Sequence, residues 1–243
     1  MKVLDAHKLS YRELNDIIKE EAPREKEIKI KNLRGQRYIG GTLKEGCTLY
    51  LDGIPGNDLA SFMNGAHIVV SGNAQDGVGN TMNKGEIVIH GHAGDIMGYA
   101  MRGGEIYVKT DVGYRVGIHM KEFGEQIPML IIGGSAGNFL GEYMAGGVII
   151  VLGIGDSPEE SIGNFCGTGM HGGRIYIRGE VPAFKFGKEV KEAAMEEEDY
   201  RLLKDKIKKY CKYFDYPMKK INLEDFHKYV PIGSRPYGNL YAY

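Results

Sequence analysis

The residues from 90 to 108 are the part of the sequence whose types and spacing most invite a chemical interpretation. His90 and His92 flank a glycine, and two histidines at positions i and i+2 of a strand lie on one face, as a metal clip requires. The same stretch holds three glycines with the spacing G-x-x-G-x-x-x-G, namely Gly91, Gly94 and Gly98. A glycine-rich turn can surround a phosphate with backbone N–H groups. The stretch therefore offers two chemistries, metal binding and phosphate binding.

The glycine spacing is repeated elsewhere, and this repetition favours a structural role. It recurs at Gly134, Gly137 and Gly141, whereas a dinucleotide-binding fingerprint occurs once, follows a strand and opens a helix. Turn glycines supply positive φ or leave room where the chain bends sharply. The sequence therefore predicts positions of a structural repeat, and these are Gly72, Asp76, Gly79, Gly91, Gly94, Asp95, Gly98, Gly134, Gly137, Asn138, Gly141, Gly153, Asn164 and Gly167.

Asp76 and Asp95 stand nineteen residues apart, in the same position of the repeat. Two adjacent carboxylates can act as general acid and base, as in β-helical enzymes that cleave polysaccharides. The position continues as Asn138 and Asn164, however, and Asp and Asn side chains stabilise turns by bonding to nearby backbone. A turn-stabilising ladder is the favoured interpretation, and an independent β-helix enzyme with a carboxylate or histidine site is the alternative. No catalytic, cofactor-binding or metal-binding residue is assigned.

The methionines show the period of the repeat, because Met63, Met82, Met101 and Met120 are each nineteen residues apart. Each is followed by a β-rich run with alternating apolar residues, which is typical of a strand. Aligning the runs places apolar residues in columns, one of which is Leu49, Ile68, Ile87, Ile106, Leu130, Ile149 and Ile175. A fixed period near twenty residues indicates a β-solenoid. We expect an all-β core, a single-stranded right-handed parallel β-helix of about six or seven coils over residues 27–181.

The segments outside the repeat differ in character. Residues 1–26 are expected to form an N-terminal helical cap, with Ser10 as N-cap and Glu13 completing a capping box. Residues 182–243 are expected to form a C-terminal helix, from Lys188 to about Phe214, and an aromatic tail that docks on a surface. Because strand edges at the ends of a solenoid invite pairing, we expect the terminal helices to cap them or the chain to form a homo-oligomer.

The charge balance is even, with 31 Lys and Arg against 32 Asp and Glu. Proteins that bind nucleic acids or membrane surfaces are strongly basic, so neither kind of partner is expected. Three widely separated cysteines without a CxxC pair favour reduced thiols over disulfides or a zinc site. The charged N-terminus has no signal-peptide core and no membrane span is predicted, so we expect a cytoplasmic protein.

Two stretches carry a family resemblance: GNDLASFMNGAHIVVSGNAQDGVGNTMNKGEIVIHGHAGDIMGYAMRGGEIYV, residues 56–108, and NLRGQRYIGGTL, residues 32–43. They resemble the GXGXG motif of the C-terminal β-helix domain of the glutamate synthase large subunit, over about residues 27–181. The ends of the chain, including RPYGNLYAY, look like the stand-alone version of this domain known from archaea and some bacteria. One of the subunits of formylmethanofuran dehydrogenase is similar to this domain in its repeats.

The resemblance implies a structural role. In glutamate synthase, glutamine is hydrolysed in an amidotransferase domain with an N-terminal cysteine nucleophile, and ammonia passes to a flavin domain that makes glutamate from 2-oxoglutarate. The β-helix domain of this family has no assigned catalytic residue, and here residue 2 is Lys2 and no cysteines cluster for an iron–sulfur centre. We therefore expect a scaffold subunit without a cofactor of its own, which organises separate amidotransferase and FMN/iron–sulfur subunits. A scaffold of another redox complex, such as formylmethanofuran dehydrogenase, is the alternative.

Overall fold

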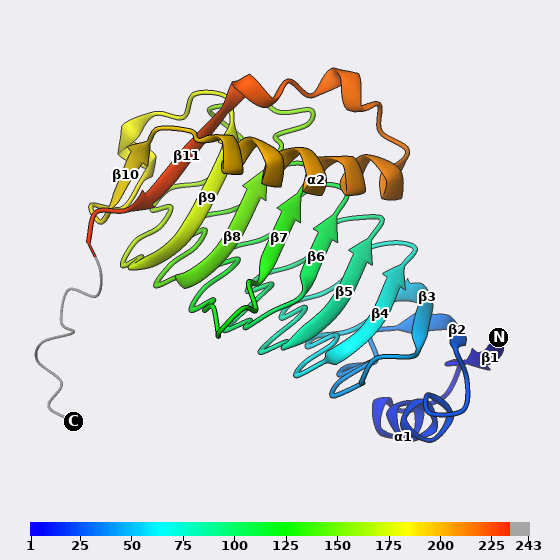
Figure 1. Ribbon diagram of the computed structural model, residues 1–243. Helices are drawn as coiled ribbons and strands as arrows, with labels where there is room; N and C mark the ends of the chain where they lie inside the picture. Colours follow the sequence, from blue (N-terminus) through cyan, green and yellow to red (C-terminus); the bar gives the residue numbers. More distant parts are fainter. Residues whose placement is uncertain (234–243) are drawn as a thin grey trace, which may run out of the picture.

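The computed structural model describes residues 1–233 of the chain. Its main body is a stack of coils, each of which contributes one strand to an eleven-stranded sheet (Figure 1). From β1 to β9, neighbouring strands pair in parallel and in chain order. These strands are β1 (Lys2–Asp5), β2 (Glu27–Arg34), β3 (Thr48–Ile54), β4 (Asn64–Val70), β5 (Lys84–Ile89), β6 (Glu105–Val108), β7 (Met129–Ile132), β8 (Ala145–Val151) and β9 (Gly172–Arg178).

The apolar columns of the sequence are inward-facing rows of this sheet. Leu49 pairs with Ile68, and the row continues in register to Ile175 with every side chain buried. A second buried row runs in the same way from Leu51 to Ile177. Burying one aliphatic side chain contributes about 1.5–3 kcal/mol, so each coil stabilises its neighbours. The predicted β-solenoid, with its strands in register, is confirmed.

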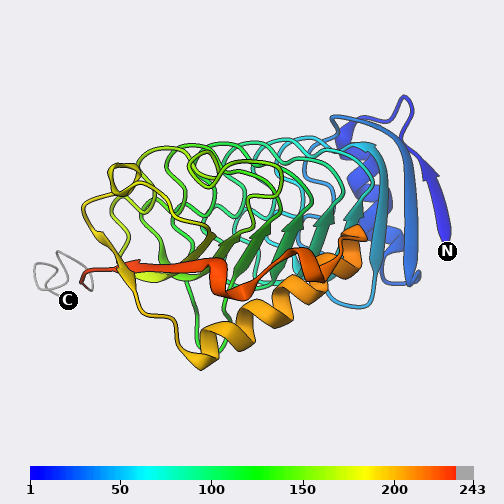
Figure 2. The same ribbon diagram turned by 90° about the horizontal axis from the view of Figure 1, so that it is seen from above.

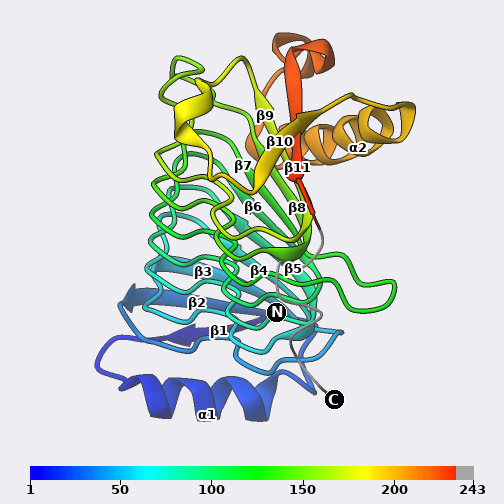
Figure 3. The same ribbon diagram turned by 90° about the vertical axis from the view of Figure 1, so that its left-hand side faces the viewer.

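Helix α1 (Tyr11–Glu21) closes the N-terminal end of the stack. The Ser10 hydroxyl accepts a hydrogen bond from the Glu13 N–H, and the Ser10 N–H donates to Glu13 Oε2 at 2.8 Å, so the predicted capping box is present. Leu14 and Ile18 point from α1 into the inner core and are buried. Figure 3 shows the helix crossing the end of the stack next to β1 and β2. The prediction of a cap at this end is confirmed.

The C-terminal segment differs from the prediction. The helix expected from Lys188 begins only at the start of α2 (Glu197–Phe214), and part of the preceding segment forms β10 (Val190–Ala193). Strand β11 (Phe226–Pro231) pairs antiparallel with both β9 and β10, so the sheet ends in the order β9–β11–β10. The helical prediction was wrong for residues 190–193 because the pairing partner of β10 lies far along the chain, outside any local window.

Helix α2 lies along the outer face of the strands and not across the end of the stack (Figures 1 and 2). Leu203, Ile207 and Phe214 of the helix form a second apolar core with outward-facing residues of the sheet, among them Tyr107 and Ile150. The last coil is covered instead by the segment around η1 (Ala183–Lys185), where the N–H of Gly187 donates to the Cys166 carbonyl at 2.7 Å. The expectation that a helix caps this end was wrong.

Two short 3-10 helices, η2 (Met218–Lys220) and η3 (Leu223–Asp225), connect α2 to β11. Among residues 1–233, no helix has both the length and the apolar character needed to cross a membrane. The prediction that the aromatic tail docks on a surface concerns residues 234–243, which lie outside the described part of the chain.

Candidate functional site

The repeated Asp and Asn side chains hydrogen-bond to the backbone of the next coil. Asp76 Oδ1 accepts a hydrogen bond from the Asp95 N–H at 2.9 Å, and Asp95 Oδ1 accepts one from the Tyr114 N–H at 2.8 Å. Asn138 Oδ1 accepts in the same way from the Asn164 N–H at 2.8 Å. Backbone N–H groups need such partners wherever a turn interrupts regular pairing. The polar column of the sequence is therefore a ladder that ties the turns of successive coils together.

The glycine before each donor residue leaves the space that the ladder needs. A Cβ added to Gly94 would lie 2.1 Å from Asp76 Oδ1, and one added to Gly113 would lie 2.1 Å from Asp95 Oδ1. Such distances are far below van der Waals contact, so a side chain there would displace the acceptor. Three further glycines stand in the same relation to the acceptors Asn73, Asp111 and Asn138, and these are Gly91, Gly134 and Gly163.

A second set of repeat glycines faces the inner core with left-handed backbone. Its φ values lie between 67° and 71°, at Gly79, Gly98, Gly141 and Gly167. A Cβ at Gly98 would lie 2.9 Å from Leu130 Cδ1, inside the apolar row. Gly137 would meet a backbone oxygen at 2.9 Å, and Gly153 also has positive φ, whereas the nearest atom to a Cβ at Gly72 is 3.9 Å away. Space and backbone angle therefore explain these glycines, Gly72 excepted.

Replacing Asp95 by alanine is expected to lower the free energy of unfolding by about 1 kcal/mol, because the Tyr114 N–H loses its acceptor. Asp95→Asn keeps an oxygen in the same place and is expected to stay within about 0.5 kcal/mol of the wild type. Urea denaturation measures both values. Equal losses in the two variants would show that the carboxylate charge, and not the ladder hydrogen bond, is what the position needs.

The two histidines of the opening stretch do not converge. The ring of His90 packs against that of Phe214 in α2, with centroids 5.2 Å apart, and burial lowers the pKa of His90. His92 is exposed at the following turn, where its backbone N–H donates to Asn73 Oδ1 at 3.1 Å. In the described part of the chain, no group of three or more His, Cys, Asp or Glu residues is placed to hold a metal ion. The interpretation of His90 as an exposed surface residue was wrong, because α2 covers it.

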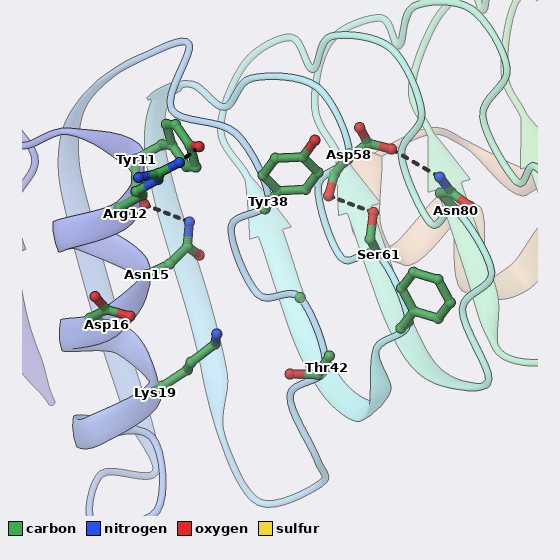
Figure 4. Close-up of a pocket in the computed structure, with 12 residues that line it drawn as sticks. Tyr11, Arg12, Asn15, Asp16, Lys19, Tyr38, Thr42, Asp58, Ser61 and Asn80 are labelled. Carbon is green, nitrogen blue, oxygen red and sulfur yellow. Dashed lines mark hydrogen bonds between the residues drawn. The ribbon is translucent and has the colours of Figure 1, made fainter.

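A groove of about 580 Å³ lies between α1 and the turns of the first coils (Figure 4). Its charges balance, because Arg12 and Lys19 on the helix are matched by Asp16 on the helix and Asp58 on the coils. Aromatic rings line both walls, and those of Tyr11 and Tyr38 have centroids 5.9 Å apart. A neutral groove with rings, donors and acceptors suits a segment of polypeptide better than an anion. Sequence reasoning missed this groove, because its two walls come from different elements.

A cluster of charged side chains holds α2 against the sheet. Glu86 and Glu105 pair in register on β5 and β6, and Lys209 of α2 forms salt bridges with both carboxylates. Lys206 Nζ lies 3.0 Å from Glu105 Oε1, and the Tyr213 hydroxyl donates to Glu86. Sequence reasoning missed the cluster. The available signal was the stacked Glu pair, because like charges directly opposite each other on neighbouring strands require a cation.

Acid is expected to destabilise the fold through Glu86. Burial alone would raise its pKa, but hydrogen bonds from His67, Lys209 and Tyr213 lower the pKa of Glu86 from 4.5 to about 2. A carboxylate with a depressed pKa stabilises the fold above its unfolded pKa, and this contribution, about 3 kcal/mol at most, is lost as the pH falls from about 4.5 to about 2. The free energy of unfolding should therefore fall less steeply below pH 4.5 in Glu86→Gln than in the wild type. Parallel curves for the two proteins would contradict this prediction.

The chain was compared with known proteins. A family model described as the GXGXG motif matches residues 7–232. The uncharacterized protein MJ1350 of Methanocaldococcus jannaschii is 50% identical over 250 residues, which cover 99% of this chain and 96% of that protein. The fold is similar to a chain in the X-ray crystal structure of the formyltransferase/hydrolase complex (FhcABCD) from Methylorubrum extorquens in complex with methylofuran. The TM-score is 0.60 and the identity 21%, over 86% of this chain and 84% of that chain, so this similarity shows the fold alone.

Proposed function

This chain belongs to the GXGXG motif family, and from that premise we propose that it is a non-catalytic scaffold subunit of a multi-subunit enzyme complex. Its work would be to hold catalytic subunits at fixed positions along a rigid stack of coils. The stack suits this role because its strands pair continuously in register and its terminal elements pack onto the same body.

The observation that carries the proposal is the use to which the fold puts its reactive side chains. The carboxylates of Asp76 and Asp95 accept hydrogen bonds from backbone amides of the next coil. Those of Glu86 and Glu105 bind Lys209 of α2. Active sites usually break local structural rules, whereas these groups follow the repeat or fasten one element to another. Holding the fold together is therefore the role that their contacts support.

The complex that we propose is a glutamate synthase, which converts glutamine and 2-oxoglutarate to glutamate. The opening motif and the repeats, which resemble the corresponding domain of the large subunit, support this choice. The partners would be a separate amidotransferase subunit and a subunit with FMN and iron–sulfur centres. In this arrangement all cofactors belong to the partners, and the chain alone has no turnover.

A second candidate is a scaffold role in a complex that handles formyl groups. It is favoured by the similarity in fold to a chain of the formyltransferase/hydrolase complex. The two candidates share the scaffold role and differ in the catalytic subunits, so the identity of the partners decides between them.

Purification of the tagged chain from its native host tests the proposal. We expect an amidotransferase and a flavin subunit to co-purify, with flavin absorbance and glutamine-dependent glutamate formation in the complex. Formyltransferase-type partners would support the second candidate. Turnover or bound flavin in the chain freed of other subunits would contradict the scaffold role.

A further inference from the structure

Two columns of residues with left-handed backbone run along the turns that precede the strands. Their N–H groups donate to carbonyls of the next coil, as those of Phe62 and Tyr143 do to Asn80 and Thr168. Six side chains with rings stand in these columns, with φ between 51° and 64°: Tyr38, Phe62, His119, Phe139, Tyr143 and Phe165. Together with Tyr99, whose ring contacts His119, they form a surface that we call the aromatic edge.

Backbone preference does not account for these rings. Positive φ is unfavourable for residues with a Cβ, and especially for bulky ones. The same two columns contain Gly77 and Gly169, with φ of 72° and 70°, so glycine fits the turn. Bulky residues held in a disfavoured conformation point to a function that needs their side chains.

The rings join neighbouring coils and remain half-exposed. Phe139 stacks on Phe165 with centroids 5.0 Å apart, and His119 stacks on Tyr143 at 5.4 Å. Phe62, Tyr143 and Phe165 nevertheless keep 54%, 46% and 51% of their surface exposed. Each stack fixes the orientation of its rings and leaves apolar surface in water. Exposed patches of this kind, rich in aromatic residues, are typical of protein-binding surfaces.

The left-handed columns carry no net charge. Their charged residues are Asp58 and Arg115, and both are engaged within the chain. Asp58 Oδ1 accepts a hydrogen bond from Asn80 Nδ2 at 3.0 Å, and Arg115 Nε lies 3.0 Å from Glu142 Oε2. A nucleic acid would require cations facing its phosphates. Neutral exposed rings complement an uncharged, apolar surface of another protein.

We infer that the aromatic edge is the surface with which this chain binds a partner subunit, through uncharged apolar side chains that pack on the rings. The groove beside α1 shares Tyr38 and Phe62 with the edge, so the contact surface continues from the coils to the N-terminal cap (Figure 4). Helix α2 lies elsewhere, on the outer face of the strands. The inference rests on the proposed function for the existence of a partner subunit and adds the surface that binds it.

The test compares the wild-type chain with two variants. Phe62→Asn combined with Phe165→Asn removes two rings of the edge, and asparagine tolerates left-handed backbone. Phe184→Asn is the matched control, because Phe184 is 76% exposed and lies outside the edge, in η1. Subunits that the tagged wild-type chain retains in its native host are identified, purified separately, and titrated with all three proteins. Tyr38→Asn replaces the double variant if thermal unfolding shows that the double variant does not fold.

The edge variant is expected to bind the identified subunit at least about tenfold more weakly than the wild type, and the control to bind with unchanged affinity. Equal affinities would overturn the inference. So would a wild-type chain that retains no subunit, or one that forms a dimer which the edge variant cannot form. A subunit that binds through the edge but is neither an amidotransferase nor a flavin protein would contradict the proposed function and leave this inference standing.

Discussion

Replacing Gly85 by alanine is expected to lower the free energy of unfolding by about 3–5 kcal/mol, a large part of what a domain has. Gly85 lies near the start of β5 with φ of 105°, a conformation that residues with a Cβ rarely adopt. An added Cβ would stand 2.3 Å from the backbone oxygen of Ala66, which moves only if the coils of β4 and β5 separate. Backbone strain and overpacking each cost about 1–3 kcal/mol, and here both apply.

Gly46 provides the matched control for this substitution. Its φ is 104°, but a Cβ there would have no neighbouring heavy atom within 4 Å. Gly46→Ala therefore carries the strain without the collision and is expected to cost about 1–3 kcal/mol. Urea denaturation of both variants gives the two free energies. Equal losses would mean that the close approach of the coils at Gly85 contributes nothing.

Replacing Asp199 by alanine is expected to cost about 3–5 kcal/mol, because it leaves a buried lysine without a counter-ion. Asp199 is 1% exposed, and its Oδ2 accepts hydrogen bonds from Lys228 Nζ at 2.7 Å and from the Glu196 N–H at 2.8 Å. Its Oδ1 accepts one from the Tyr176 hydroxyl at 2.6 Å. One carboxylate thus joins the first turn of α2 to β9 and β11.

Two controls separate the ion pair from the general cost of substitution in α2. Glu197→Ala removes a carboxylate whose side chain is 87% exposed and is expected to change the free energy of unfolding by less than about 0.5 kcal/mol. Asp199→Leu combined with Lys228→Met removes both buried charges and is expected to recover much of the lost stability. Chemical denaturation of the three variants measures these values. A double variant as unstable as Asp199→Ala would contradict the assignment to the unpaired lysine.

The core of the solenoid could be predicted because each coil repeats the same requirement. Residues that occupy one column, such as Leu49 and Ile68, meet the same inward environment, so their period is visible without any knowledge of the structure. The cap at Ser10 was equally accessible, because a capping box involves residues only three apart.

Elements that depend on distant partners could not be predicted in this way. Val190 pairs with Pro231, so the strand β10 is decided by residues outside its local sequence. His90 lies under Phe214, which comes from a helix in another part of the chain. The sequence around each residue contains no sign of this contact.

The aromatic edge escaped sequence reasoning for a different reason. Residue type predicts left-handed backbone at glycine and asparagine, and it argues against such backbone at Phe62 or Tyr143. The signal lay in the register, because Gly77 and Gly169 occupy the same columns as these rings. Comparing what one column accepts across the coils would have revealed the unusual positions.

The most direct test of the scaffold role is reconstitution from separately purified subunits, analysed by native mass spectrometry. With this chain present, we predict one complex that contains it together with the amidotransferase and the flavin subunit. With the chain omitted, the two catalytic subunits should remain separate, and glutamine-dependent glutamate formation should be lost. Catalytic subunits that assemble and turn over at the full rate without this chain would contradict the account.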